Sequence, residues 1–354
     1  LVAREVDTVL DTRRDPREQR LSVGMVAAVQ RCCPYLEELV LGWGSEFDPR
    51  LGGPQAQGGF AAPVWAAQVP DLDEGGGQLS NLKAAVLPGH ILLDPRCLHS
   101  FCGCAPPLET LDISSSQSLD DTVLTATLPL VARTLRSLNV RGTSFGDATA
   151  AALAAAGTKL ARLNASCTML TGRGLAVLSA ASDRLHYLDL CYADKLATAD
   201  VLACVHRHGE RLTMLGVGGF ADLTTSLVRE LLQESSATML HFGCGGCEAL
   251  DGTAMLEVVA ELCPQLRALN MHRLTRCTID AFRTLLNGCP GLVSLDCHGC
   301  DIEGSPGEDE MDDETIGEQL AAKERWMALG QPYDVHFHES SVIRSTHPLV
   351  RLQR

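Results

Sequence analysis

Four cysteines form two Cys-x-x-Cys pairs, a spacing that many zinc sites use. The pairs are Cys244/Cys247 and Cys297/Cys300. Together they could supply the four thiolates of a tetrahedral zinc site. Coordination requires both pairs to converge on one point. The structural elements that carry the pairs therefore decide whether a metal can bind.

Histidine pairs and glycine-rich stretches are the other features with recognisable chemistry. The pairs His206/His208 and His336/His338 could ligate a metal. The stretches GVGGF (216–220) and GCGGC (243–247) resemble phosphate-binding loops, but both lack the G-x-G-x-x-G and G-x-x-x-x-G-K-[ST] patterns. No nucleophile elbow, zinc-protease helix or kinase signature occurs in the sequence. We therefore expect no enzymatic activity, no catalytic residues, no bound metal and no cofactor.

A repeat of about 26 residues organises the elements that carry these side chains. Its pattern is Leu-x-x-Leu-x-Leu, in which other apolar residues also occupy the fourth and sixth positions. From Leu82 onward, successive first positions are 25 to 27 residues apart. The first positions are Leu36, Leu82, Leu108, Leu135, Leu160, Leu185, Leu212, Met239, Leu266 and Leu292. This regularity predicts a stack of similar structural units.

Each unit is expected to contain one β-strand followed by one α-helix. Apolar residues at the fourth and sixth positions predict a strand with one buried face. Helical patterns follow, for example in 147–160, 224–236 and 251–263. Four residues are expected to cap helix N-termini: Asp120, Thr171, Thr224 and Asp251. The prediction is an α/β horseshoe-shaped solenoid, with a parallel β-sheet on its concave face and α-helices on its convex face.

Two columns in the helical part of the alignment support this arrangement. Seven residues before the first position, the side chain is apolar in nine units: Val29, Phe101, Leu128, Leu153, Leu178, Val205, Leu232, Val259 and Leu285. Three residues before it, the same units have a small residue: Cys33, Ala105, Ala132, Gly157, Ser182, Gly209, Ser236, Cys263 and Cys289. The small residues are expected where a helix end approaches the next strand. The unit at Leu82 departs from both columns, with Gly75 and Leu79.

The repeat divides the chain into four predicted segments: an N-terminal cap and first helix (1–35), about ten repeat units (36–300), an acidic loop (301–314) and a C-terminal region (315–354). An insertion at 44–78 is rich in glycine and proline and interrupts the repeats near their start. The C-terminal region is expected to contain a helix at 315–329, a degenerate strand within 333–338 and a tail.

Three units contain the motif Cys-Pro-x-Leu-x-x-Leu-x-Leu, in which Met or Cys can replace the last Leu. It stands at 33–41, 263–271 and 289–297. With the period near 26, it resembles the cysteine-containing subtype of leucine-rich repeats over roughly residues 20–300. This subtype is typical of F-box/leucine-rich-repeat proteins, the substrate receptors of SCF-type (cullin–RING) ubiquitin ligases. The resemblance implies substrate recognition that leads to ubiquitin-dependent protein degradation.

An F-box has no match in residues 1–35. A Skp adaptor and a cullin are therefore implied as partners only if an F-box lies upstream. Proteins with such repeats also include structural components, for example of cilia. The alternative implied by the resemblance is a scaffold subunit of a large assembly, such as a ciliary or axonemal one, without a ligase role.

The alignment offers a second interpretation of the two Cys-x-x-Cys pairs. Cys244 and Cys297 occupy the sixth, buried position of their units. Cys247 and Cys300 occupy the ninth, where leucine-rich repeats place Asn, Cys, Ser or Thr to satisfy backbone groups at the bend. The pairs are two repeats apart, at roughly 5 Å per strand, which is too far for thiolates that each lie about 2.3 Å from one ion. We therefore favour a structural role for all four cysteines.

The outward-facing strand positions are the candidate partner-binding residues, because solenoids commonly bind partners on the concave face. The candidates are Asn139, Arg141, Arg162, Asn164, Tyr187, Asp189, Tyr192, His241, Asn270, His272, Arg273, Asp296 and His298. Tyr and Arg are enriched among the residues that dominate binding energy at interfaces. The alternative is an ordinary solvated sheet face, which also needs polar residues.

Six glycines interrupt this outward face in two neighbouring units: Gly216, Gly218, Gly219, Gly243, Gly245 and Gly246. Tyr187 and Tyr192 precede them in the stack, and His272 and Arg273 follow them. This pattern predicts a hollow with a glycine floor and with aromatic and cationic walls. A partner's side chain or a small ligand could bind in such a hollow.

Charge and composition exclude several classes of partner. The net charge is −15 and the pI is near 5.1, which argues against binding to nucleic acid or to anionic membranes. No apolar run reaches the length of a membrane span. The 15 cysteines are odd in number and many lie in apolar stretches, which favours a reducing compartment. We expect a cytoplasmic or nuclear protein, or a ciliary one under the scaffold alternative.

Overall fold

The computed structural model describes six ranges of the chain: 38–40, 81–87, 95–104, 107–297, 299–303 and 334–336. Within them, the side chains of 38–40, Cys97, Cys104, 302–303 and 334–336 are not described. The predicted N-terminal cap, the glycine- and proline-rich insertion and the C-terminal helix lie outside the described residues. His298 and residues 304–314 of the predicted acidic loop also lie outside them.

One parallel sheet of eleven strands runs through the described residues, and its strands follow one another in chain order. The strands are β1 (Glu38–Val40), β2 (Ala84–Val86), β3 (Thr110–Asp112), β4 (Ser137–Asn139), β5 (Arg162–Asn164), β6 (Tyr187–Asp189), β7 (Met214–Gly216), β8 (His241–Gly243), β9 (Ala268–Asn270), β11 (Ser294–Asp296) and β13 (Asp334–His336). The first ten begin two residues after the ten first positions of the repeat. β13 lies in the segment predicted to contain a degenerate strand, and it pairs with β11.

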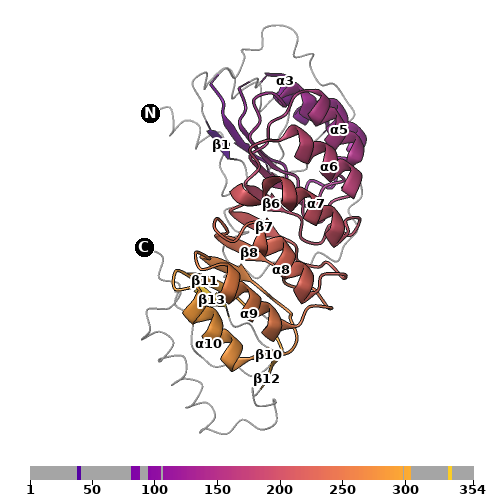
Figure 1. The fold of residues 1–354 in the computed structure, drawn as a ribbon. Coiled ribbons are helices and arrows are strands. Elements are labelled where there is room, and N and C mark those ends of the chain that lie inside the picture. Colours follow the sequence, from indigo (N-terminus) through magenta and orange to yellow (C-terminus); the bar gives the residue numbers. More distant parts are fainter. Residues whose placement is uncertain are drawn as a thin grey trace, which may run out of the picture.

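Helices follow the strands and lie on the other side of the sheet. They are α3 (Pro95–Cys104), α4 (Asp121–Thr127), α5 (Asp147–Ala155), α6 (Gly172–Ala181), α7 (Thr198–His208), α8 (Thr225–Gln233), α9 (Gly252–Leu262) and α10 (Ile279–Gly288), with 3₁₀ turns η2 (Leu128–Leu130) and η3 (Gly209–Arg211). Figure 1 shows a curved stack with strands along its inner side and helices along its outer side. The predicted α/β leucine-rich-repeat solenoid is confirmed. No helix of the described ranges is long and apolar enough to cross a bilayer.

The core lies between the sheet and the helices, as the repeat predicts. Leu188 and Leu190, at the fourth and sixth positions of one unit, are fully buried. The eight described members of the apolar helix column, from Phe101 to Leu285, are each exposed by 2 % or less. Burial of a side chain of this size contributes about 1.5–3 kcal/mol. The stack is therefore stabilised mainly by one apolar layer that every unit extends.

The column of small residues has causes that differ from the expected one. At Gly209, an added Cβ would lie 2.7 Å from the Cβ of Glu234, at the end of the next helix. Gly157 has a φ of +85°, and an added Cβ there would meet no atom within 4 Å. Gly209 therefore permits contact between two helix ends, and Gly157 permits a left-handed backbone conformation. The next strand is not the neighbour at either position.

Three of the four predicted N-caps are confirmed. Asp120 accepts a hydrogen bond from the N–H of Val123, Thr171 from Arg173, and Asp251 from Ala254. Thr224 precedes α8, but its side chain makes no capping bond. Its hydroxyl instead lies 3.0 Å from the Ser226 hydroxyl, so the prediction for Thr224 was wrong.

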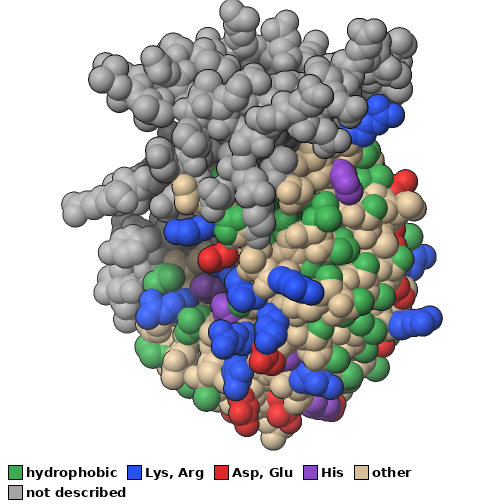
Figure 2. Space-filling view, turned by 90° about the horizontal axis from the view of Figure 1, so that it is seen from above, with side chains coloured by type: hydrophobic (Ala, Val, Ile, Leu, Met, Phe, Trp, Pro, Cys, Tyr) green, Lys and Arg blue, Asp and Glu red, His purple; other side chains and the backbone are tan. Residues whose placement is uncertain are grey.

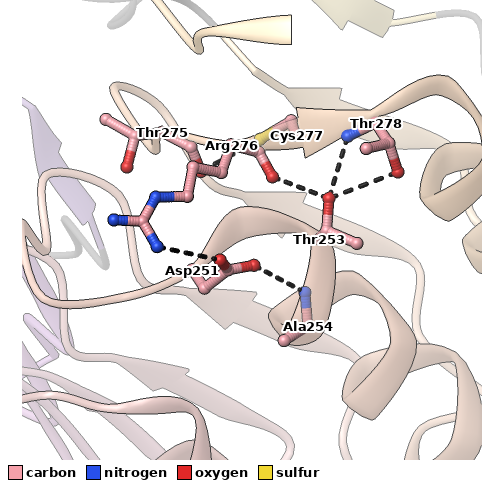
Figure 3. Close-up of polar contacts among 7 residues, drawn as sticks. All are labelled: Asp251, Thr253, Ala254, Thr275, Arg276, Cys277 and Thr278. Carbon is pink, nitrogen blue, oxygen red and sulfur yellow. Dashed lines mark hydrogen bonds and ion pairs between the residues drawn. The ribbon is translucent and has the colours of Figure 1, made fainter. Parts of the chain in front are cut away.

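A small second sheet departs from the repeat near its C-terminal end. It pairs β10 (Cys277–Thr278) with β12 (Ile302–Glu303). The segment before α10 is also bonded to the start of α9 (Figure 3). The Thr253 hydroxyl donates to the carbonyl of Arg276 and accepts from the N–H of Thr278, over 2.6 and 3.0 Å. The Arg276 guanidinium lies 3.7 Å from Asp251. These contacts fix the connection between the two helices.

Candidate binding surface

The concave face presents side chains from two ends of each strand. The strand-start cluster comprises residues at the second and third repeat positions of β4 to β9: Arg136, Arg162, Tyr187, Met214, His241 and Arg267. The strand-end rows comprise the fifth, seventh and eighth positions. Figure 2 shows Lys and Arg side chains over part of one face, with His, Asp and Glu side chains among them.

Asn and Asp side chains at the fifth position hold the ends of the strands. In five units, the Oδ1 atom accepts a hydrogen bond from the backbone N–H two residues later, over 2.9–3.3 Å: Asp112, Asn139, Asn164, Asp189 and Asn270. Amide groups also link neighbouring strands, from Asn139 to Asp112 and from Asn270 to Asp296. These candidate binding residues therefore satisfy backbone groups of their own sheet.

The eighth position has a left-handed backbone in eight consecutive units. Its φ lies between 54° and 79° at Ser115, Gly142, Cys167, Tyr192, Gly219, Gly246, Arg273 and Gly299. Four of these residues are glycine, which adopts such angles without strain. For the other four, this conformation costs roughly 1–2 kcal/mol. We did not predict this bend, although four glycines in one column of the alignment were a signal for it.

Tyr192 and His272 form a hydrogen-bonded bridge across the strand-end rows. The Tyr192 hydroxyl lies 2.7 Å from Nε2 of His272, and Nδ1 of His272 lies 2.6 Å from Oδ1 of Asn270. Because Oδ1 is an acceptor, Nδ1 of His272 is the donor, and Nε2 then accepts from the phenol. Burial raises the pKa of Tyr192, which keeps this donor protonated at neutral pH.

The Tyr192–His272 bridge fills the part of the predicted hollow that lies above Gly219, Gly245 and Gly246. A Cβ at Gly219 would overlap the Tyr192 ring, and one at Gly245 would overlap the His272 ring. At Gly246 an added Cβ would lie 2.5 Å from the Tyr192 hydroxyl oxygen. The glycines thus make room for side chains of the protein itself. The prediction of an open hollow for a ligand was wrong, because the tyrosine lies over the floor instead of forming a wall.

The strand-start cluster is built around Tyr187. The register places Arg162, Tyr187, Met214 and His241 beside one another on β5 to β8. The Arg162 guanidinium carbon lies 4.7 Å from the centre of the Tyr187 ring, within range of a cation–π interaction. Burial and the Asp189 carboxylate raise the pKa of Tyr187. Burial lowers the pKa of His241, and Arg267 and Arg162 lower it further.

Acidic residues lie beside the cluster but not within its positions: Glu109 of the preceding unit is bonded through its backbone to Arg136, and the Asp189 carboxylate acts on Tyr187. The second and third positions of β4 to β9 contain no Asp or Glu. Within the described ranges, Arg136, Arg162 and Arg267 form no ion pair with a carboxylate. Arg136 only approaches two backbone carbonyls, at 3.4 and 3.5 Å. The cluster is therefore a cationic surface whose charge the described residues do not neutralise.

The other candidates are distributed around the strand-end rows. Arg141 and Arg273 are exposed, and Arg273 is one of the strained residues at the bend. The structure brings Tyr192, His272, Asn270 and Asp296 into one hydrogen-bonded chain. Arg162, Tyr187 and His241 lie at the other end of the strands. The twelve described candidates thus lie in two adjoining groups, at the two ends of the strands, and His298 lies outside the described residues.

The cysteine pairs occupy the repeat positions that the alignment assigned to them. Cys244 and Cys297 are buried. The Cys247 thiol donates to the carbonyl of Val217 and the Cys300 thiol to that of Met271, over 3.3 and 3.0 Å. Burial raises the pKa of Cys247 to about 11, which favours the thiol over the thiolate. In the described part of the chain, no three His, Cys, Asp or Glu side chains are arranged to hold a metal.

The residues of one histidine pair lie in different environments. His208 is buried, and its Nε2 lies 3.0 Å from the hydroxyl of Ser179. His206 is exposed and lies 3.8 Å from a carboxylate oxygen of Glu230. The side chains of His336 and His338 are not described.

Comparison with known proteins shows similarity in fold. No family model and no curated protein matches the sequence. A chain in the crystal structure of the yeast Rad7–Elc1 complex matches with a TM-score of 0.50 and 20% identity over 69% of this chain and 70% of that one. The leucine-rich repeat-containing protein LegL7 from Legionella pneumophila gives 0.40 and 12%, over 68% and 80%. Internalin InlF from Listeria monocytogenes gives 0.34 and 14%, over 74% and 82%. The first similarity supports the solenoid fold.

Proposed function

We propose that this chain is a protein-binding module that recognises substrates for an SCF-type ubiquitin ligase. The observation that carries the protein-binding part is the strand-start cluster, which is exposed at Arg162, His241 and Arg267 and whose arginines have no ion-pair partners among the described residues. A concave sheet that is already rigid can bind a partner with little loss of conformational freedom. Rad7, which has a similar fold, was crystallised as a complex with Elc1, in agreement with a protein-binding role.

The repeat subtype supports the ligase part of the proposal. Cys-Pro-x-Leu-x-x-Leu-x-Leu motifs resemble those of F-box/leucine-rich-repeat substrate receptors. In such a receptor, the solenoid binds the substrate, while an F-box joins a Skp adaptor and a cullin. The contribution of this chain would be recognition and orientation without catalysis, since a tethered substrate reaches a high effective concentration near the ligase.

The test begins with the full reading frame from the source organism, including any residues upstream of Leu1. A tagged copy expressed in that organism should co-purify with a Skp adaptor and a cullin. Inhibition of the proteasome should increase the amount of captured substrate. If Skp and cullin are absent, and the protein is instead a stoichiometric subunit of a large assembly, the ligase proposal is wrong and the scaffold alternative is supported.

A further inference from the structure

We propose that the strand-start cluster binds an extended acidic segment of a partner protein, in which carboxylates flank an apolar side chain. This inference rests on the proposed protein-binding function and specifies the chemistry of the partner. It concerns six residues at one end of the concave strands: Arg136, Arg162, Tyr187, Met214, His241 and Arg267.

Charge complementarity gives the sign of the partner. Arg136, Arg162 and Arg267 have no carboxylate partner in the described ranges, and no acidic residue shares their positions on β4 to β9. Aspartate and glutamate side chains can accept bidentate hydrogen bonds from such guanidinium groups. An acidic segment would therefore gain contacts without displacing an existing ion pair. A basic segment would be repelled by the same surface.

The register gives the length and the direction of the segment. Adjacent strands are about 4.8 Å apart, so the five intervals from β4 to β9 span about 24 Å. An extended chain advances about 3.3 Å per residue, so about seven residues cross the cluster at right angles to the strands. Carboxylates near the two ends of such a segment would reach Arg136 and Arg162 on one side, and Arg267 on the other.

The centre of the cluster is less polar than its ends. Met214 lies between Tyr187 and His241 in the register and is partly exposed. Met side chains adapt their shape to irregular apolar surfaces. An apolar side chain in the middle of the segment would cover Met214 and the edge of Tyr187. The predicted sequence pattern is therefore acidic, apolar, acidic over about seven residues.

A nucleic acid fits this surface less well than a peptide does. Single-stranded nucleic acids commonly bind by stacking bases on exposed aromatic faces. Tyr187 is the aromatic residue of the cluster, and Arg162 already covers one face of its ring. A seven-residue peptide can also place carboxylates at both ends and an apolar side chain over Met214, whereas a nucleic acid carries a phosphate at every step.

The test measures binding of fluorescein-labelled peptides to the full chain by anisotropy. The probe is Glu-Glu-Gly-Leu-Gly-Glu-Glu, and its controls replace all Glu by Gln or the Leu by Gly. We expect the Gln control to bind at least about tenfold more weakly and the Gly control about threefold more weakly. A labelled oligothymidylate of similar length tests the nucleic-acid alternative.

Charge-reversal variants locate the binding site. Arg162→Glu with Arg267→Glu should weaken binding of the acidic peptide by at least about tenfold. The matched control is Arg173→Glu with Lys195→Glu, which changes the net charge equally at exposed positions outside the cluster and should leave binding within about twofold. Circular dichroism and thermal unfolding of both variants check that the fold is retained.

Several outcomes would overturn the inference. These are no binding of the acidic peptide, equal binding of the Gln control, equal losses in the two double variants, and tighter arginine-dependent binding of the oligothymidylate. Co-purification with Skp and cullin is measured on the same variants and is independent of these results. Failure of the acidic-segment proposal can therefore be separated from failure of the ligase proposal.

Discussion

The two ends of the concave strands differ in how many of their polar side chains already have hydrogen-bond or ion-pair partners within the protein. At the strand ends, Asn and Asp side chains bond to the backbone, and Tyr192, His272, Asn270 and Asp296 form a continuous hydrogen-bonded chain. At the strand starts, the arginines around Tyr187 lack carboxylate partners among the described residues. One face of the sheet thus contains a part that stabilises the solenoid and a part whose arginines have no carboxylate partner among the described residues, where we propose that a partner binds.

This difference shows that exposure on a concave face does not identify a binding residue. Asn139 and Asn270 occupy outward positions, yet their side chains already make two kinds of hydrogen bond within the sheet. A partner that used them would have to compete with these bonds. Arg162 and Arg267 have no ion pair with a carboxylate of the described residues to give up, although Arg162 lies over the Tyr187 ring. The residues whose hydrogen-bonding and charge requirements are unmet are therefore the better candidates.

The strongest test of the packed strand ends is a pair of glycine substitutions in adjacent units. In Gly218→Ala, the new Cβ would lie 2.7 Å from the backbone carbonyl oxygen of Gly245, in the turn after β8, and this oxygen already accepts a hydrogen bond from the N–H of Gly219. We expect a loss of about 2 kcal/mol in unfolding free energy, measured by urea denaturation. In the control Gly243→Ala, the nearest atom is 3.7 Å away, and little change is expected. Similar losses in both variants would show that the close approach between Gly218 and Gly245 does not determine the loss of stability.

Two tyrosines, one in each region, provide the next test. Tyr192 has a φ of +56°, whereas Tyr187 has no such strain. Tyr192→Ala should therefore be less stable than Tyr192→Gly by about 1 kcal/mol, because glycine relieves the left-handed backbone. At Tyr187 the order should reverse, since glycine in a strand costs about 0.5–1 kcal/mol relative to alanine. The four variants are compared by urea denaturation, and the same order at both sites would contradict this difference.

The periodic part of this structure could be predicted from the sequence, because each unit repeats the same local pattern. All ten strands begin where the spacing places them, and Leu188, Leu190 and the apolar helix column are buried as predicted. The ninth-position role of Cys247 was also predicted correctly. These features depend on side-chain alternation within one unit and on contact with the next unit. The alignment of the repeat units shows both the alternation of side chains within a unit and the residues that contact the next unit.

Contacts that skip units could not be predicted in the same way. Tyr192 and His272 are 80 residues apart and lie in units separated by two others. The seventh and eighth repeat positions do show a pattern: two glycine pairs, Gly218/Gly219 and Gly245/Gly246, follow Tyr192 and precede His272 and Arg273. That pattern fits an open hollow as well as a filled one, and only the positions of the two rings distinguish these cases. The β10–β12 pair was missed because two-residue strands have no periodic pattern.

The smallest expected effect concerns pH, and it should have opposite signs for stability and for binding. The lowered pKa of His241 means that the unfolded chain binds a proton more readily, so stability should fall as the pH drops below about 6.5. Burial lowers the pKa of His208 as well, so this residue also makes stability fall as the pH drops.

A bound acidic peptide instead favours protonated His241, between Arg162 and Arg267. Its affinity should therefore rise about twofold between pH 7.5 and 6.0. His241→Gln should remove this rise, and an equal rise in that variant would show that His241 does not contact the peptide.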